Sequence, residues 1–167
     1  MGKPHSVYFE TIPEAKRMTR DQYIKVANYY FSGLAPNDGT ATEANGFFPF
    51  TDDCLRFENG TITTQQANGV PVPGACKKQF ETGLKGVVSR VRDRRFVAVD
   101  RERGIVFAFA FFDHYNLNWT WQLGELFKIE DGKIRRIEAA FHRAPFGINS
   151  GWSTYEQGIS EEPRTIR

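Results

Sequence analysis

The sequence predicts an α+β domain in which helices pack on one face of an antiparallel sheet. Two observations predict it: apolar residues recur at helical spacing in the first third of the chain, and four long strand-like segments follow residue 87. A length of 167 residues with a hydrophobic fraction of 40% fits one domain with a sizeable core. We therefore expect a single folded unit over residues 19–150, preceded by an arm at 1–18 and followed by a tail at 151–167.

The first predicted helix begins after the polar arm. Thr19 and Gln22 form a capping-box pattern, and apolar residues then recur at helical spacing as far as a break at Pro36. The next expected elements are a helix at 40–48, a strand at 55–58, a polar loop at 61–74 and a helix at 75–84. The loop could cover a pocket or be a simple surface excursion.

The second half predicts four strands that form an antiparallel meander: 87–100, 105–115, 119–130 and 133–142. The segment 105–112 is apolar at every position, so both of its faces should be buried. The helices would cover one face. A second subunit is the expected cover for the other, which predicts a homo-oligomer, a dimer or trimer formed through the sheet. The tail reads as polar and irregular.

Composition excludes several classes of function. The 22 basic and 20 acidic side chains nearly cancel, so nucleic acid is not an expected partner, and the chain has no apolar run long enough to span a membrane. Cys54 and Cys76 are not in a CxxC spacing, and we interpret them as reduced thiols of a cytoplasmic protein. No phosphate loop, metal-ligand cluster or nucleophilic Ser or Cys motif appears, so we expect no cofactor and no metal.

Three local patterns carry a resemblance. Segment 30–38 (YFSGLAPND) places a tyrosine eight residues before an aspartate, segment 52–58 (DDCLRFE) ends in Glu58 after two aspartates, and Glu125 precedes a hairpin turn at Asp131-Gly132. Together with the order of helices and strands, these patterns resemble the nuclear-transport-factor-2-like superfamily. That superfamily includes ketosteroid isomerase, scytalone dehydratase and SnoaL-like polyketide cyclases.

The resemblance implies a cone-shaped fold, with helices packed on a curved antiparallel sheet, over roughly residues 19–145. It implies that Tyr30 donates a hydrogen bond to a substrate oxygen and that Glu58 shuttles the proton. With one residue fewer in the last turn, Glu125 takes the place of a second, protonated carboxyl group.

The residues themselves give a parallel interpretation. Tyr30 lies on the apolar face of the first helix, where its hydroxyl could bind a ligand or a partner in the core. Alternation places Glu125 among aromatic residues, which should raise its pKa by desolvation, although a buried pair with an arginine explains such a carboxylate equally well. Arg56 shares strand parity with Glu58, and could hold it ionised, bind a substrate oxygen or form a simple salt bridge.

His114 and His142 lie near predicted strand ends, where each could act as an acid or base or be structural. Asp113 neighbours His114 but points to the opposite face of the strand, which argues against a dyad. Four arginines are expected to form a solvated or subunit-contact face: Arg90, Arg92, Arg94 and Arg95. An alternative is that one of the first three turns inward.

These observations favour a cofactor-independent enzyme that moves protons on a hydrophobic aromatic substrate. The sharpest hypothesis comes from lyases of the same superfamily and is deformylation of a lignin-derived diarylpropane diol to a stilbene and formaldehyde. The expected substrate-binding residues are Tyr23, Phe109, Phe111, Trp119, Trp121, Phe127 and Phe141. The alternative is a non-catalytic carrier or interaction module. Three departures from the isomerase pattern favour it: a glutamate at the base position, a charged Arg56 at a usually apolar one, and the gap that Glu125 needs to match.

Overall fold

The structure is a computed structural model that describes residues 5–34 and 48–166. The first predicted helix is confirmed as α1, Arg20–Leu34. Its capping box is also present, because the Thr19 amide donates to Gln22 Oε1 at 2.8 Å and the Gln22 amide donates to Thr19 Oγ1 at 3.2 Å. The helix expected at 40–48 lies outside the described residues except for its last position.

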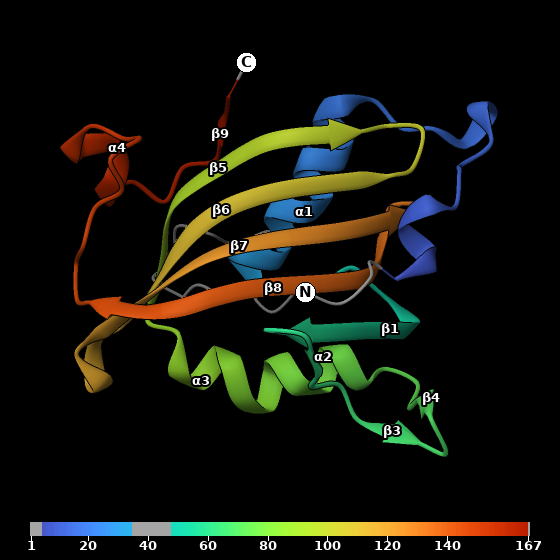
Figure 1. The fold of residues 1–167 in the computed structure, drawn as a ribbon, viewed down its shortest axis with the longest axis horizontal. Coiled ribbons are helices and arrows are strands. Elements are labelled where there is room, and N and C mark those ends of the chain that lie inside the picture. Colours follow the sequence, from blue (N-terminus) through green and yellow to red (C-terminus); the bar gives the residue numbers. More distant parts are fainter. Residues whose placement is uncertain (1–4, 35–47, 167) are drawn as a thin grey trace.

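A curved seven-stranded sheet follows, in the order β2-β1-β8-β7-β6-β5-β9 (Figure 1). Its strands are β1 (Phe50–Glu58), β2 (Thr61–Ile62), β5 (Arg90–Asp100), β6 (Ile105–His114), β7 (Trp119–Glu130), β8 (Lys133–Pro145) and β9 (Arg164–Thr165). The predicted antiparallel meander is confirmed in β5 to β8. The sheet as a whole is mixed, because β1 pairs with β8, and β9 with β5, in parallel.

The helix expected at 75–84 is a longer, interrupted run. It comprises α2 (Ala75–Gln79), a π-helical turn η3 (Phe80–Leu84) and α3 (Lys85–Val87). The preceding loop holds the two-stranded ribbon of β3 (Gln66–Ala67) and β4 (Val70–Pro71). The remaining short helices are η1 (Ser6–Phe9), η2 (Glu14–Lys16), η4 (Tyr115–Leu117) and α4 (Tyr155–Ile159).

The core lies between α1 and one face of the sheet, which we call the inner face. The buried side of α1 includes Tyr23, Ala27, Tyr30 and Phe31, all fully shielded from solvent. Figure 1 shows α1 crossing behind the meander, while the α2–α3 run extends below it from β1 toward the η4 connection. The α+β class with helices on a curved sheet, as predicted from the sequence, is confirmed.

The opposite, outer face is only partly covered by the chain itself. The arm crosses it, where the Ile12 amide donates to Glu102 O at 2.7 Å and Lys128 Nζ donates to Glu10 O at 2.8 Å. A groove of about 870 Å³ remains between the arm and the sheet. Phe107 of β6 lines this groove, and both Phe107 and Phe109 of the same strand are only half-buried, so a second subunit as their cover remains a prediction.

The arginines of β5 do not form a solvated face, contrary to expectation. Asp93 has a φ of 49° and lies in a β-bulge, which turns its neighbours to different sides of the strand. Arg94 Nη1 donates to Ser32 Oγ of α1 at 2.9 Å, whereas Arg92 Nη1 donates to Gly158 O of α4 at 2.9 Å. The tail is therefore structured, and it buries the arginines within the same chain.

The interpretation of the two cysteines as reduced thiols is wrong. Cys54 of β1 and Cys76 of α2 form a disulfide, with a Cα–Cα distance of 5.9 Å, and both are buried. They meet because the chain folds back after β4, where the Gly74 amide donates to Asp52 O at 3.1 Å and α2 begins beside β1. Nothing in the cysteine spacing indicates this return of the chain.

Candidate active site

The candidate active site is centred on Arg56, whose side chain is only 3% exposed. Its Nε donates to Glu58 Oε1 at 2.8 Å, and its Nη1 donates to Glu125 Oε1 at 2.9 Å. The same Nη1 donates to the hydroxyl of Tyr30. One guanidinium thus joins two carboxyl groups and a phenol, which we call the Arg56 cluster: Tyr30, Arg56, Glu58 and Glu125.

Strand pairing explains why these side chains meet. Glu125 of β7 lies opposite Ala139 of β8, and Ala139 lies beside Glu58 of β1. Because paired residues point to the same side of a sheet, the two carboxyl groups share one row on the inner face. Ala139 separates them with only a methyl group. Tyr30 approaches the row from the buried side of α1.

Tyr30 and Glu125 form a short, fully buried hydrogen bond. The Tyr30 hydroxyl donates to Glu125 Oε1 at 2.5 Å. Burial raises the pKa of Glu125, and its contacts with Arg56 and Tyr30 offset only part of that rise. Burial likewise raises the pKa of Tyr30 well above its ordinary value. Both groups therefore tend to keep their protons.

The charges of the cluster balance if Glu125 is protonated. Burial alone would lower the pKa of Arg56, but the neighbouring acidic groups raise it, so the guanidinium stays charged. Its charge is then matched by the Glu58 carboxylate, and the four side chains carry no net charge. This state avoids the large cost of an unpaired charge inside the protein.

Some polar atoms of the cluster remain unused. Glu125 Oε2 is buried and has no hydrogen-bond partner, and Arg56 Nη2 has no acceptor among the described residues. Because Glu125 Oε1 already accepts two hydrogen bonds, the proton of Glu125 belongs on Oε2. Glu58 is 22% exposed and is the member that solvent reaches most easily. The cluster therefore offers an acid, a free N–H donor and a carboxylate.

Phe80 is a neighbour of the cluster that sequence reasoning missed. Its ring centre lies 5.2 Å from the Arg56 guanidinium carbon and 4.8 Å from the centre of the Tyr30 ring. It belongs to η3, and π-helical turns in other proteins frequently occur at functional sites. Arginine side chains often stack on aromatic rings, but nothing in the sequence identifies Phe80 as the ring beside Arg56.

Three of the expected substrate-binding residues lie on the inner face beyond the cluster. Trp121 and Phe141 are partly buried and stand against each other with ring centres 4.9 Å apart. Trp119 lies farther along the same face of β7, and Arg143 covers its ring at 3.4 Å. All three share the inner face with the Arg56 cluster, and their part in substrate binding stays a prediction.

The other four expected substrate-binding residues do not belong to this group of partly buried side chains on the inner face. Tyr23 and Phe127 are core residues with no exposed surface. Phe109 and Phe111 point to the outer face, where arginines of β5 stack on them, because β6 alternates about the buried positions Ala108 and Ala110. They do not face the Arg56 cluster, and their expected role in substrate binding stays a prediction.

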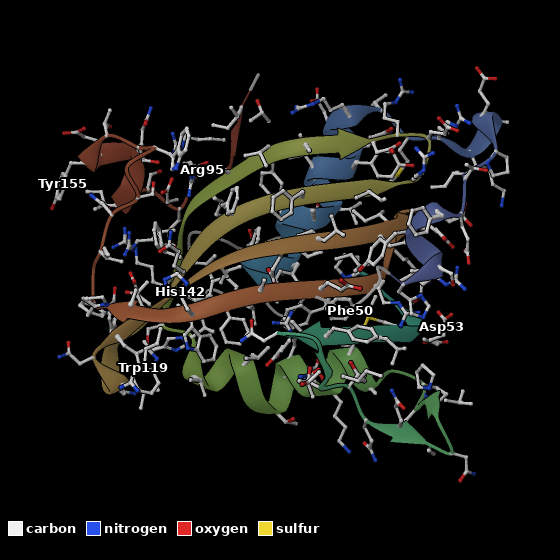
Figure 2. The ribbon with its side chains drawn as sticks, viewed as in Figure 1. Phe50, Asp53, Arg95, Trp119, His142 and Tyr155 are labelled. Carbon is white, nitrogen blue, oxygen red and sulfur yellow. A yellow bond between two sulfur atoms is a disulfide. The ribbon has the colours of Figure 1, made fainter. Side chains whose placement is uncertain are left out.

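The two histidines lie on opposite faces of the sheet. His114 is fully buried on the inner face, with its ring centre 4.3 Å from that of Trp121. His142 is exposed on the outer face, opposite Gln122, and does not approach the cluster. Figure 2 shows His142 and Trp119 toward the same end of the sheet, far from Asp53. Of the two, only His114 is placed to meet a ligand of the inner face.

Metal ligands and membrane spans are not evident in the part of the chain that the structure describes. Within residues 5–34 and 48–166, no three His, Cys, Asp or Glu side chains come together as a metal site. In the same ranges no helix has the length and apolar character needed to cross a bilayer.

Comparison with known proteins places the chain in a family. A family model described as "Domain of unknown function (DUF8021)" matches residues 16–141. No curated protein sequence matches the chain. A de novo designed protein with a curved β-sheet is similar in structure, with a TM-score of 0.54 and 17% identity over 75% of this chain and 88% of that one. An NTF-2 like protein of unknown function from Burkholderia xenovorans LB400 gives a TM-score of 0.49 and 12% identity, over 79% and 90% of the two chains.

Proposed function

Since the chain belongs to the DUF8021 family, a description that names no activity, we propose its function from the Arg56 cluster: cofactor-independent acid–base catalysis on a hydrophobic aromatic substrate. The observation that carries the proposal is the buried Oε2 of Glu125, which has no hydrogen-bond partner and lies beside Arg56, with Glu58 in the same row; burial raises the pKa of Glu125, which favours a proton on this atom. A buried donor without an acceptor costs roughly 1–3 kcal/mol, and a substrate oxygen would recover it.

The roles follow from the charge and exposure of each group. Glu58 is the general base, because it is the accessible carboxylate. Glu125 is the general acid, and Tyr30 and Arg56 hold the conjugate base that forms when it gives up its proton. Trp121 and Phe141 bind the aromatic part of the substrate.

The sharpest form of the proposal is a lyase that acts on a 1,2-diarylpropane-1,3-diol. Glu58 takes the proton of the hydroxyl group on C3. The C2–C3 bond breaks, and C3 leaves as formaldehyde. The released electron pair forms the new double bond as the benzylic hydroxyl departs as water with the proton of Glu125. The diol is thereby converted into a stilbene, formaldehyde and water, and proton exchange with solvent restores both carboxyl groups.

A non-catalytic carrier is the second candidate, and one observation favours it. Glu58 Oε1 is already held by Arg56 at 2.8 Å, so the base is not free in the ligand-free chain. A carrier would bind the same hydrophobic compounds through Trp121 and Phe141 and release them unchanged.

The experiment is incubation of the purified protein with a panel of diarylpropane diols, with absorbance and formaldehyde measured together. Stilbene and formaldehyde in equal amounts are the expected result. A new chromophore without formaldehyde would replace the lyase by a dehydratase or isomerase, and saturable binding without any product would leave the carrier.

The disulfide bears on the compartment. A cytoplasmic location was expected because no apolar run is long enough to span a membrane, and the cysteines were interpreted as reduced in keeping with it. The Cys54–Cys76 disulfide does not fit that expectation. Because disulfides persist in oxidising environments, we propose that the protein works in such a compartment. Thiol labelling of the protein recovered from its own cells tests this: labelling of both cysteines under denaturing, non-reducing conditions would contradict it.

A further inference from the structure

The inner face continues beyond the Arg56 cluster to a second pair of buried polar atoms. His114, the last residue of β6, lies directly opposite Trp119, the first residue of β7. Their ring centres are 6.3 Å apart. Neither His114 Nε2 nor Trp119 Nε1 has a hydrogen-bond partner, although both atoms are buried. Two unpaired polar groups on one paired position are uncommon in a folded protein.

The hydrogen-bonding roles of these two atoms are opposite and fixed. His114 Nδ1 lies 2.9 Å from Val87 O, and a carbonyl can only accept, so Nδ1 carries the hydrogen and Nε2 presents a lone pair. Burial lowers the pKa of His114, which keeps the ring neutral. An indole nitrogen can only donate, so Trp119 Nε1 presents a hydrogen. The site therefore has one acceptor and one donor.

This pair is separated from the cluster by an apolar stretch. Trp119 lies six residues before Glu125 on the same face of β7, which corresponds to about 20 Å along the strand, and Trp121 lies between them. The α2–α3 run follows the same side of the sheet, because Phe80 contacts Arg56 and the Val87 carbonyl contacts His114 Nδ1. Phe141 and Trp121 stand between the two polar ends, which fits a molecule with two linked aromatic rings.

We propose that His114 and Trp119 recognise a phenolic hydroxyl on the far ring of a two-ring substrate whose near end reacts at the Arg56 cluster. A hydroxyl group donates and accepts at once, so it can satisfy Nε2 and Nε1 together. A carboxylate or phosphate would offer no hydrogen to Nε2. An ether oxygen would satisfy Trp119 alone. The inference rests on the proposed function for the position of the reacting end, and it identifies the substrate class as phenolic.

Ligand binding tests the inference without any turnover. The probes are 4-hydroxystilbene and 4-methoxystilbene, titrated into the full-length protein with tryptophan fluorescence as the readout. We expect the phenol to bind about tenfold more tightly than its methyl ether, because one buried hydrogen bond to an otherwise unpaired acceptor is worth roughly 1–3 kcal/mol. His114→Phe should remove this preference while keeping the affinity for the ether. His142→Phe, which changes the exposed histidine, is the matched control and should keep the preference.

Two results would overturn the inference: equal affinities of the wild-type protein for the two probes, or a preference that survives in His114→Phe. If that variant does not fold, the nitrogen-15 resonance of His114 Nε2 in the wild-type protein decides. It should shift with the phenol and not with the ether.

The failure of each proposal has its own signature. A phenol preference without turnover of any diol would contradict the lyase and leave the phenol site standing. Turnover of a diol with no preference for the phenol would contradict the phenol site and leave the lyase standing.

Discussion

Two of the buried arginine–carboxyl clusters among the described residues, those of Arg56 and Arg92, differ in how completely their hydrogen bonds are used. Arg92 on the outer face donates from Nε and Nη2 to both oxygens of Asp113, at 2.7 and 3.1 Å. Its other hydrogen bonds go to two main-chain carbonyls and to Asn149 Oδ1. Thr120 Oγ1 donates a further hydrogen bond to Asp113 Oδ1, at 2.6 Å. In the Arg56 cluster, by contrast, Glu125 Oε2 and Arg56 Nη2 lack partners among the described residues.

This difference separates a structural ion pair from a chemical site. The Arg92 pair is saturated by α4 and the segment before it, so it holds the tail on the sheet and has nothing left to offer a ligand. In the Arg56 cluster, the Glu125 carboxyl group and Arg56 Nη2 keep hydrogen-bonding capacity that no described residue uses. They lie next to the partly exposed Glu58 carboxylate. Burial and ion pairing alone do not distinguish the two clusters, whereas an inventory of unused atoms does.

The largest expected effect is on catalysis by Glu58→Gln. Removing the general base should lower kcat/KM by roughly 10²- to 10⁴-fold, with a melting temperature close to that of the wild type. Steady-state kinetics and a thermal melt of the same sample measure both quantities. Asp52→Asn, an exposed carboxyl group on the same strand, is the control and should retain full activity. Full activity of Glu58→Gln would remove Glu58 from the mechanism.

Arg92→Leu should have a large effect of the other kind. It leaves Asp113 buried without its cation, which typically costs about 3–5 kcal/mol of the free energy of unfolding. Urea denaturation should show this loss, while turnover per folded molecule stays near that of the wild type. A variant with unchanged stability but much reduced turnover would reverse the assignment of the two clusters.

Loss of the disulfide should weaken the Arg56 cluster through α2. Replacing Cys54 and Cys76 by serine removes a cross-link between residues that are 22 positions apart. This should lower the free energy of unfolding by about 3 kcal/mol. Because α2 leads directly into η3 and Phe80, turnover should fall as well. Denaturation and kinetics of the double variant check this, and unchanged values for both would show that the disulfide does not position the site.

The smallest expected effect is a pH dependence of stability carried by Glu125. Its pKa is raised in the folded state, so the native protein binds the proton more tightly than the unfolded chain. This contribution is complete below the unfolded pKa of about 4.5 and is lost as pH rises through the folded pKa. The wild type should therefore lose stability relative to Glu125→Gln above that pH, by at most about 1.4 kcal/mol per pH unit. Denaturant midpoints of both proteins between pH 4 and 8 give the difference, and a gain with rising pH would mean that Glu125 is ionised.

Sequence periodicity predicted the framework because it depends on local patterns. Alternation along β7 placed Glu125 and Trp121 on one face, and parity along β1 paired Arg56 with Glu58. The same alternation along β6 predicts that His114 points to the inner face and Phe109 to the outer face. From the sequence it was applied only to the neighbours Asp113 and His114.

The features that sequence reasoning missed depend on non-local returns of the chain. The bulge at Asp93 redirects the arginines of β5, and the tail then folds back to bury them. The disulfide and the contact of Phe80 with Arg56 both require α2 to lie beside β1. No spacing of residues within these segments predicts that position.

The protonation state of Glu125 at neutral pH decides whether the Arg56 cluster can act as an acid. Infrared difference spectroscopy of the wild type against Glu125→Gln isolates the carbonyl stretch of a single un-ionised carboxyl group. We expect this band to be present in the wild type at pH 7 and absent from the variant. A difference spectrum that shows only carboxylate bands would mean that Glu125 is ionised, and the Arg56 cluster would then be a structural ion pair like that of Arg92.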